Sequence, residues 1–167
     1  MTDEDWMQHA IALAAKAEAQ GEVPVGAVLV KDNQLIAEGW NQMISNQDPS
    51  AHAEMQAIRA GAQAINNYRL IDCTLYITLE PCSMCAGAMV HSRIKRLVFG
   101  AHDLKTGAAG SVLNIVQKPE FNHQLEVVSG VLAETCSEQL SAFFRRRRAQ
   151  IKAARQQQKL LKQTAGE

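Results

Sequence analysis

The sequence lacks any apolar run that approaches the roughly 20 residues needed to span a membrane. Its N-terminus, Met1-Thr2-Asp3-Glu4-Asp5, has neither the basic start nor the apolar stretch of a secretory signal. Internal repeats and an internal linker are also absent. These absences argue against a membrane or secreted protein, and we expect a cytoplasmic one. In that reducing compartment, four cysteines indicate metal binding or catalysis rather than a disulfide scaffold.

Net charge is absent as well, but only as an average over the chain. Residues 141–167 carry eight Lys or Arg and one acidic side chain, a sum of +7, whereas residues 1–140 sum to −7. A basic tail on an acidic body indicates a polyanionic partner, although a solvated terminal helix explains the charge equally well. Length and a 47% apolar content predict one compact domain over residues 1–150. Residues 151–167 are expected to form a basic, frayed tail with few apolar anchors.

Hydrophobic periodicity and turn residues predict a series of helices and strands. Helices are expected near residues 2–20, 51–64, 81–91 and from about 132 onward, and strands near 25–30, 35–40, 74–78, 96–100 and 125–128. The turn Asp32-Asn33 predicts a hairpin of the first two strands. About 24 residues separate the last two strands, a length that permits a crossover and therefore a parallel pairing. The pattern predicts a three-layer α/β/α fold: a mixed five-stranded sheet with helices on both faces.

Two short motifs stand where helices are expected to begin: His52-Ala53-Glu54 and Pro81-Cys82-Ser83-Met84-Cys85. Helix positions three apart share a face, so Cys82 and Cys85 can bind one ion through both sulfurs. Zinc takes thiolate and imidazole ligands in tetrahedral geometry, and the positive end of a helix dipole favours the thiolate form. We therefore predict a zinc site formed by His52, Cys82 and Cys85.

The number of ligands predicts a catalytic rather than a structural metal. No fourth ligand is convincing, because Cys73 and Cys136 lie outside any metal spacing and are interpreted as small buried hydrophobes. Catalytic zinc leaves one position for a water, whose pKa it lowers to about 7. Glu54, two residues from His52, can exchange protons with that water. Taken alone, the His-Ala-Glu motif can occur by chance, and the C-x-x-C motif is often structural zinc or redox-active. Together the two motifs predict catalytic zinc.

The joint pattern is the signature of zinc-dependent nucleobase deaminases, and the chain resembles the bacterial tRNA-specific adenosine deaminases. The resembling segments cover most of residues 20–145: EVPVGAVLV, Gly39-Trp40-Asn41, AHAEMQAI, YRLIDCTLYITLEPCSMCAGAMVHSRI and FGAHDLKTGAAGS. The resemblance implies a hydrolase that converts adenosine to inosine at the wobble position of an arginine tRNA. In that reaction the activated water attacks C6 of the flipped-out adenine and ammonia leaves.

The resemblance also implies roles for individual residues. It assigns one zinc ion per subunit to the three ligands named above, and proton transfer to Glu54. The remaining matches concern the substrate: a hydrogen bond to the base from Asn41, a pocket wall formed partly by Val25 and Ala53, and a loop beside the anticodon from Asp103 to Gly110, with Lys105 in it. Asn41 after a strand is also a common turn residue. Family members are homodimers whose two subunits both contact tRNA.

Near the C-terminus, Phe143-Phe144 precede four arginines, Arg145 to Arg148. Arginines neutralise phosphates, and aromatic rings stack on unpaired bases for about 1–3 kcal/mol each. The alternative is that the phenylalanines pack under the helix while the arginines only solvate it. We expect one Phe in the core and one near the substrate, with Phe144 and Arg148 as candidate RNA contacts.

Two other functions compete with tRNA deamination. A zinc deaminase of a free base or nucleoside, such as guanine or cytidine, would share the metal pattern; the basic tail and the KTGAAGS loop favour nucleic acid. A zinc-stabilised RNA-binding module without catalysis would need neither Glu54 nor an open ligand position. Measuring inosine on an anticodon stem-loop against the free compounds separates the three.

Overall fold

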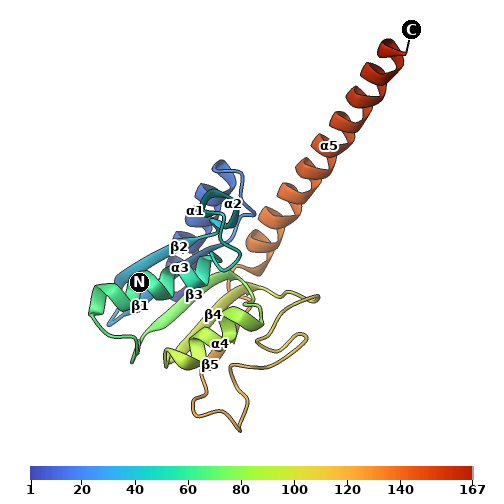
Figure 1. Ribbon diagram of the computed structural model, residues 1–167. Helices are drawn as coiled ribbons and strands as arrows, with labels where there is room; N and C mark the ends of the chain where they lie inside the picture. Colours follow the sequence, from blue (N-terminus) through green and yellow to red (C-terminus); the bar gives the residue numbers. More distant parts are fainter. Residues whose placement is uncertain (167) are drawn as a thin grey trace.

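The structure is a computed structural model in which residues 1–166 are described (Figure 1). Its elements in chain order are α1 (Asp3–Ala19), β1 (Gly26–Lys31), β2 (Gln34–Trp40), α2 (Met43–Asn46), α3 (Ala53–Ile65), β3 (Thr74–Leu79), α4 (Ser83–His91), β4 (Arg96–Ala101), β5 (Glu126–Ser129) and α5 (Ala133–Ala165). No helix among the described residues is long and apolar enough to cross a membrane.

The five strands form one mixed sheet in the order β2-β1-β3-β4-β5. β1 pairs antiparallel with β2, its hairpin partner, and with β3. The β3–β4 and β4–β5 pairs are parallel, each joined by a crossover. The mixed five-stranded sheet predicted from the sequence is therefore confirmed, including the parallel pairing of the last two strands.

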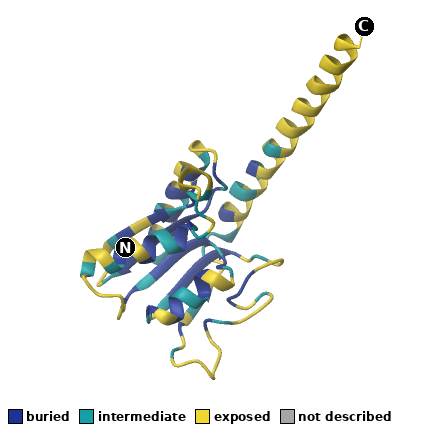
Figure 2. Ribbon diagram, in the orientation of Figure 1, coloured by how far each residue is buried: buried dark blue, intermediate teal, exposed yellow. Residues whose placement is uncertain are grey.

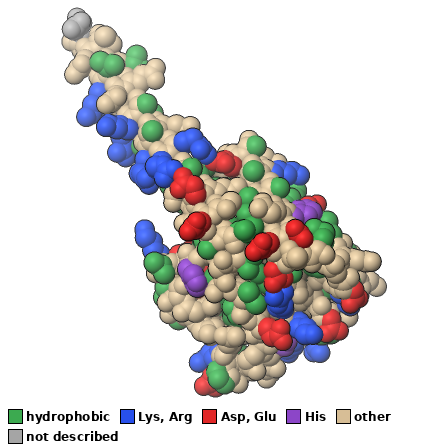
Figure 3. All heavy atoms as spheres, turned by 180° about the vertical axis from the view of Figure 1, so that it is seen from behind, with side chains coloured by type: hydrophobic (Ala, Val, Ile, Leu, Met, Phe, Trp, Pro, Cys, Tyr) green, Lys and Arg blue, Asp and Glu red, His purple; other side chains and the backbone are tan. Residues whose placement is uncertain are grey.

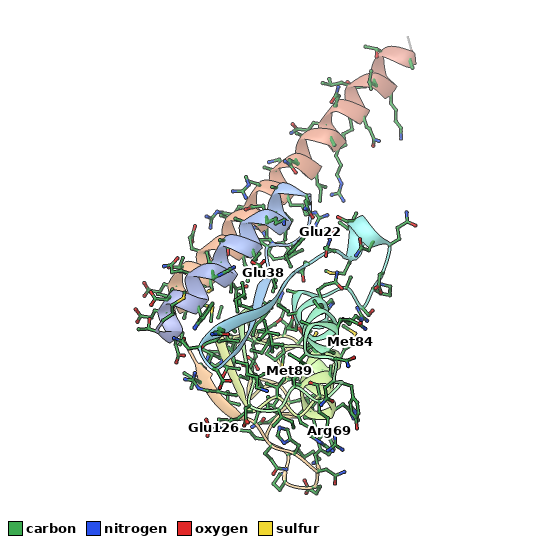
Figure 4. All side chains as sticks on the ribbon, turned by 90° about the vertical axis from the view of Figure 1, so that its left-hand side faces the viewer. Glu22, Glu38, Arg69, Met84, Met89 and Glu126 are labelled. Carbon is green, nitrogen blue, oxygen red and sulfur yellow. The ribbon has the colours of Figure 1, made fainter. Side chains whose placement is uncertain are left out.

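Helices cover both faces of this sheet, and alternate residues of each central strand enter the two cores. Leu29 of β1 packs in the core under α3 and α4, whereas its neighbour Val28 packs in the core under α1 and α5. Figure 4 shows α1 and α5 together on one side of the sheet and α3 and α4 on the other. Figure 2 shows the buried residues concentrated in the layer between them.

Helix α5 extends far beyond the body of the protein (Figure 1). Its buried residues are Cys136 and Phe143, and every described residue from Arg148 onward is exposed. The sequence predicts a frayed tail beyond about residue 152, but the helix in the structure continues to Ala165. The reason is composition: this stretch contains mostly Ala, Gln, Lys, Arg and Leu, all good helix formers, and no Pro or Gly before residue 166.

Candidate active site

The structure brings the three predicted metal ligands together. The Nδ1 atom of His52 lies 3.6 Å from the sulfur of Cys82 and 3.5 Å from that of Cys85. A tetrahedral zinc ion with a Zn–N bond of about 2.0 Å and a Zn–S bond of about 2.3 Å would separate such atoms by about 3.6 Å. Among residues 1–166 this is the one group of His, Cys, Asp or Glu side chains close enough to hold an ion. Its geometry and donor set fit zinc.

The ligands converge because two helices begin at the same place. His52 is the N-cap of α3 and Cys82 is the N-cap of α4. β3 ends at Leu79, and Glu80 and Pro81 connect it directly to Cys82. Gly39 of β2 allows the start of α3 to lie directly on the sheet, because a Cβ atom there would overlap the carbonyl of Ala53.

The two sulfur atoms and the imidazole interact through hydrogen bonds. The pKa of Cys82 falls to about 4, because Cys85 donates a hydrogen bond to its thiolate; burial opposes this shift and His52 reinforces it. The pKa of Cys85 is raised, first because its proton is held by Cys82 and then by burial. The hydrogen bond with Cys82 also raises the pKa of His52. A divalent cation must displace these protons, so its affinity is expected to fall in acid.

Glu54 lies in the first turn of α3 and is buried beside Cys85. Burial raises the pKa of this carboxyl to about 7, while its own backbone N–H and the charge of His52 act in the opposite direction. A carboxyl that exchanges its proton near neutral pH is suited to general acid–base work.

Asn41 bridges the segments on either side of the site. Its side-chain amide donates to the carbonyl of Val23 at 3.0 Å, and its oxygen accepts the N–H of Ala53 at 2.9 Å. One amide hydrogen and one lone pair therefore stay available for a ligand. Val25 and Ala53, the two predicted wall residues, are both buried in the core that also contains Cys85.

The loop from Asp103 to Ser111 is fastened to the site by Glu80. This fully buried carboxylate accepts the N–H groups of Asp103 at 3.1 Å, Ala109 at 3.1 Å and Ser111 at 3.0 Å, and also the Ser111 hydroxyl. Burial alone raises the pKa of Glu80, but these hydrogen bonds outweigh it and the net pKa lies below the usual value. The N–H of Ala108 donates to the Pro81 carbonyl at 2.8 Å, next to Cys82.

The predicted substrate residues of this loop and of α5 meet in a hollow. Asp103 shapes the loop, since its carboxylate accepts the N–H groups of Lys105 and Thr106. The hollow beyond it is lined by Lys105, Ser141, Phe144, Arg145 and Arg148. The structure thus brings Lys105 close to Phe144 and Arg148, which follow it by about 40 residues in the sequence.

Phe143 is buried, as the sequence predicts for one of the two phenylalanines, and Phe144 is 41% exposed. Contact of Phe144 with the substrate stays a prediction. The four arginines are not equivalent either. Arg145 pairs with Glu138 on the same helix, and Arg146 pairs with Glu18 of α1.

Arg147 stacks its guanidinium over the Phe143 ring at 5.4 Å. Arg148 makes no ion pair within the part of the chain that is described, and it faces the hollow.

Sequence reasoning missed two buried carboxylates beside the site, Glu80 and Glu22. Glu22 accepts the N–H groups of Ile44 and Ser45 and the Ser45 hydroxyl, and so holds the short helix α2, which was also not predicted. The one local signal that could have indicated these buried carboxylates was an acidic residue with apolar neighbours in the sequence. The hydrogen-bond partners lie about 20 to 30 residues farther along the chain and leave no local pattern.

Comparisons with known proteins agree with this geometry. Residues 1–101 match the family model described as the cytidine and deoxycytidylate deaminase zinc-binding region. A tRNA-specific adenosine deaminase of Haemophilus influenzae is 61% identical over 90% of this chain and 87% of its own length. The corresponding protein of Bacillus subtilis is 53% identical over 92% and 95%.

A solved structure from studies of A-to-I editing by tRNA:A34 deaminases at the wobble position of transfer RNA has the same fold. It superposes with a TM-score of 0.79 at 40% identity and covers 81% of this chain and 99% of that one.

Proposed function

Because the chain belongs to the family of cytidine and deoxycytidylate deaminases with a zinc-binding region, we propose that it is a tRNA adenosine deaminase. It removes the amino group from C6 of the wobble adenosine in a tRNA anticodon by hydrolysis of the C6–N bond. An arginine tRNA is the expected substrate. Water supplies the new C6 oxygen, inosine forms, and ammonia leaves. The tRNA specificity is carried over from the relatives.

One observation carries the catalytic part of this proposal. His52, Cys82 and Cys85 form a cluster of zinc dimensions with three protein ligands, and a buried carboxylate, Glu54, lies against it. A purely structural zinc site is closed by four protein ligands and needs no acid–base group. This combination favours catalysis over a zinc-stabilised binding module.

Each side chain then has a defined task. His52, Cys82 and Cys85 hold the zinc, one ion per subunit, and zinc when bound acts as a Lewis acid that acidifies a water. The Glu54 carboxylate accepts a proton from the attacking water and returns it to the nitrogen that leaves. Asn41 uses its free amide hydrogen and lone pair to orient the base.

The substrate is an RNA rather than a free base, and the hollow beside the site supports this. Lys105 and Arg148 supply charges for phosphates there, and Phe144 supplies an exposed ring on which a base can stack. Asp103 keeps Lys105 in place through the turn that it caps. Val25 and Ala53 contribute the apolar floor near Cys85.

The active form is a homodimer that joins through α4. The outer face of this helix is open, since a Cβ on Gly87 would meet nothing within 4 Å. Gly87 also lines a surface hollow with His91, Ile115 and Phe121, among others. We expect a dimer in sedimentation at micromolar concentration, and a monomer there would contradict this assignment. The protein acts in the cytoplasm, where thiol ligands stay reduced.

The decisive experiment is a deamination assay on the zinc-loaded protein. The substrate is an anticodon stem-loop with adenosine at the wobble position, and inosine is measured by mass spectrometry of the digested RNA. The matched control carries its adenosine one position away. Free adenosine, guanine and cytidine are tested in parallel.

Inosine at the wobble position alone supports the proposal. Turnover of guanine or cytidine without turnover of the RNA would identify a base or nucleoside deaminase instead. Tight RNA binding by a zinc-loaded protein that deaminates nothing would identify a binding module.

A further inference from the structure

The exposed half of α5 is a helix without support from the body. All described residues from Arg148 to Gly166 are exposed, and the last buried side chain of the helix is Phe143. At 1.5 Å per residue, the part beyond Arg148 projects by about 25 Å. Isolated helices of about this length are marginal in water, so this segment depends on the helix propensity of its residues rather than on packing.

Five basic residues follow one another along this helix at spacings of four, three, four and three: Arg148, Lys152, Arg155, Lys159 and Lys162. With 100° per residue, these positions fall within about 80° of one face and form a stripe about 21 Å long. Figure 3 shows Lys and Arg side chains in a row along the projecting helix. We call this row the basic stripe.

The opposite face of the helix is uncharged. It carries Gln150, Ala153, Gln157, Leu160 and Thr164. No acidic residue occurs from 139 to 166, so nothing on the helix offsets the stripe. Like charges three and four residues apart destabilise a helix by a few tenths of a kcal/mol per pair. The arrangement is thus unfavourable for the free helix and becomes favourable when a row of negative charges lies against it.

The basic stripe begins in the hollow between α5 and the loop that Glu80 holds. Arg148 lines that hollow together with Lys105 and Phe144. The arginines that precede it, Arg145 and Arg146, are already paired with Glu138 and Glu18. Arg147 stacks on Phe143 and does not line the hollow, so Arg148 is the first cation of α5 that lines the hollow without an acidic partner. The stripe continues outward from it.

We infer that the basic stripe is an arm that binds the backbone phosphates of the base-paired stem next to the anticodon loop. The inference rests on the proposed function, which places the loop in the hollow at the base of the arm. Double-stranded RNA is recognised mainly through its backbone and shape, and a row of cations about 21 Å long suits that mode. Pairing of the stripe with the stripe of a second copy is unfavourable, because two such rows of positive charge would repel each other.

The test is a pair of variants of the full-length, zinc-loaded protein. The neutral variant replaces Lys152, Arg155, Lys159 and Lys162 with Gln. The relocated variant keeps these four Gln substitutions and adds four basic residues on the opposite face: Gln150→Lys, Ala153→Arg, Gln157→Lys and Thr164→Lys. Its net charge therefore equals that of the parent. Circular dichroism checks that the helix persists in both.

Binding and deamination are measured on two RNAs, an anticodon stem-loop with its complete stem and the same loop on a shortened stem. On the complete stem, we expect both variants to raise Kd about ten-fold or more near 0.1 M salt. The log–log salt slope should become shallower by up to about 3 in the neutral variant. The turnover rate at saturating RNA should stay unchanged, because the stripe lies outside the catalytic cluster. On the shortened stem, all three proteins should bind within about two-fold of one another.

Three results would overturn the inference. An unchanged Kd of the neutral variant would show a merely solvated helix. A relocated variant that binds as the parent does would show attraction by net charge without a stripe. A change of oligomeric state in the neutral variant without RNA would assign the stripe to a second copy. A different result would refute the proposed function and still support the inference about the arm. In it, the parent protein binds RNA through the stripe but deaminates no RNA.

Discussion

Replacing Glu80 with Ala should destabilise the fold strongly and loosen the loop from Asp103 to Ser111. The buried carboxylate is the acceptor for three backbone N–H groups and one hydroxyl of that loop. Each buried donor left without an acceptor costs about 1–3 kcal/mol. Two effects reduce this cost. The variant no longer buries a charge, and water can reach the N–H groups of Asp103 and Ser111, which are not fully buried. Four donors at that cost, reduced by these two effects, lead us to expect a loss of about 3–5 kcal/mol.

The assay is urea unfolding of the zinc-loaded protein, combined with hydrogen exchange of the three backbone amides. Ser111→Ala is the matched control: it removes one donor and leaves the carboxylate with the three N–H groups, for a loss of about 1.5 kcal/mol. Glu80→Gln should fall between the two, because its amide keeps one accepting oxygen and turns a second donor toward the loop.

The reasoning about Glu80 would be refuted by a variant Glu80→Ala that unfolds within about 1 kcal/mol of the parent and keeps the three amides protected. The pH dependence has a defined sign. Since the folded pKa of Glu80 is lowered, its contribution is fully present above the ordinary pKa of about 4.5. It is lost as the pH falls through the folded value.

Three further predictions follow from the site and its surroundings. Glu54→Gln should keep zinc and fold but lose nearly all inosine formation; loss of zinc by metal analysis would instead make Glu54 a ligand. Arg148→Gln should raise KM for the stem-loop several-fold, whereas Arg145→Gln should change it little, because Arg145 is already paired; equal effects would contradict this. Asp3 accepts hydrogen bonds from Arg96, which hold its pKa below the usual 3.8, against burial. The stability that this pair provides should be present above pH 3.8 and lost below it, so Asp3→Asn should flatten the acid end of an unfolding curve; an unchanged acid limb would contradict the assignment.

The fold and the metal ligands could be predicted because their signals are local. His52, Cys82 and Cys85 each stand at the start of a helix, and helix starts are marked by short motifs and by the strand or turn before them. The length of the connection permits the parallel pairing of β4 with β5 that the structure shows. In these cases a few neighbouring residues determine the outcome.

The supporting contacts could not be predicted because they join distant segments. Glu80 is adjacent to a ligand, but its partners follow it by 23 to 31 residues along an irregular loop. The difference between Arg146 and Arg148 depends on Glu18 of α1 and on Lys105 of the loop, two distant segments that the arginine run does not reveal. Only the three-dimensional structure separates a paired arginine from a free one.

The uneven distribution of charge gives the RNA a direction as well as an attraction. The body up to residue 140 sums to −7, and the chain beyond it sums to +7. At the base of the arm, Glu18 and Glu138 pair with Arg146 and Arg145, so the unpaired positive charge of the helix begins at Arg147 and continues through Arg148 into the stripe. Fields in physiological salt decay over about 8–10 Å, and the outer stripe at Lys159 and Lys162 lies about 17–21 Å along the helix from Arg148. The acidic body is therefore largely screened from that outer stripe, while it still repels phosphates that approach elsewhere. In the binding mode that we propose, a stem along the arm is held away from the body, and its loop reaches the hollow lined by Lys105 and Phe144.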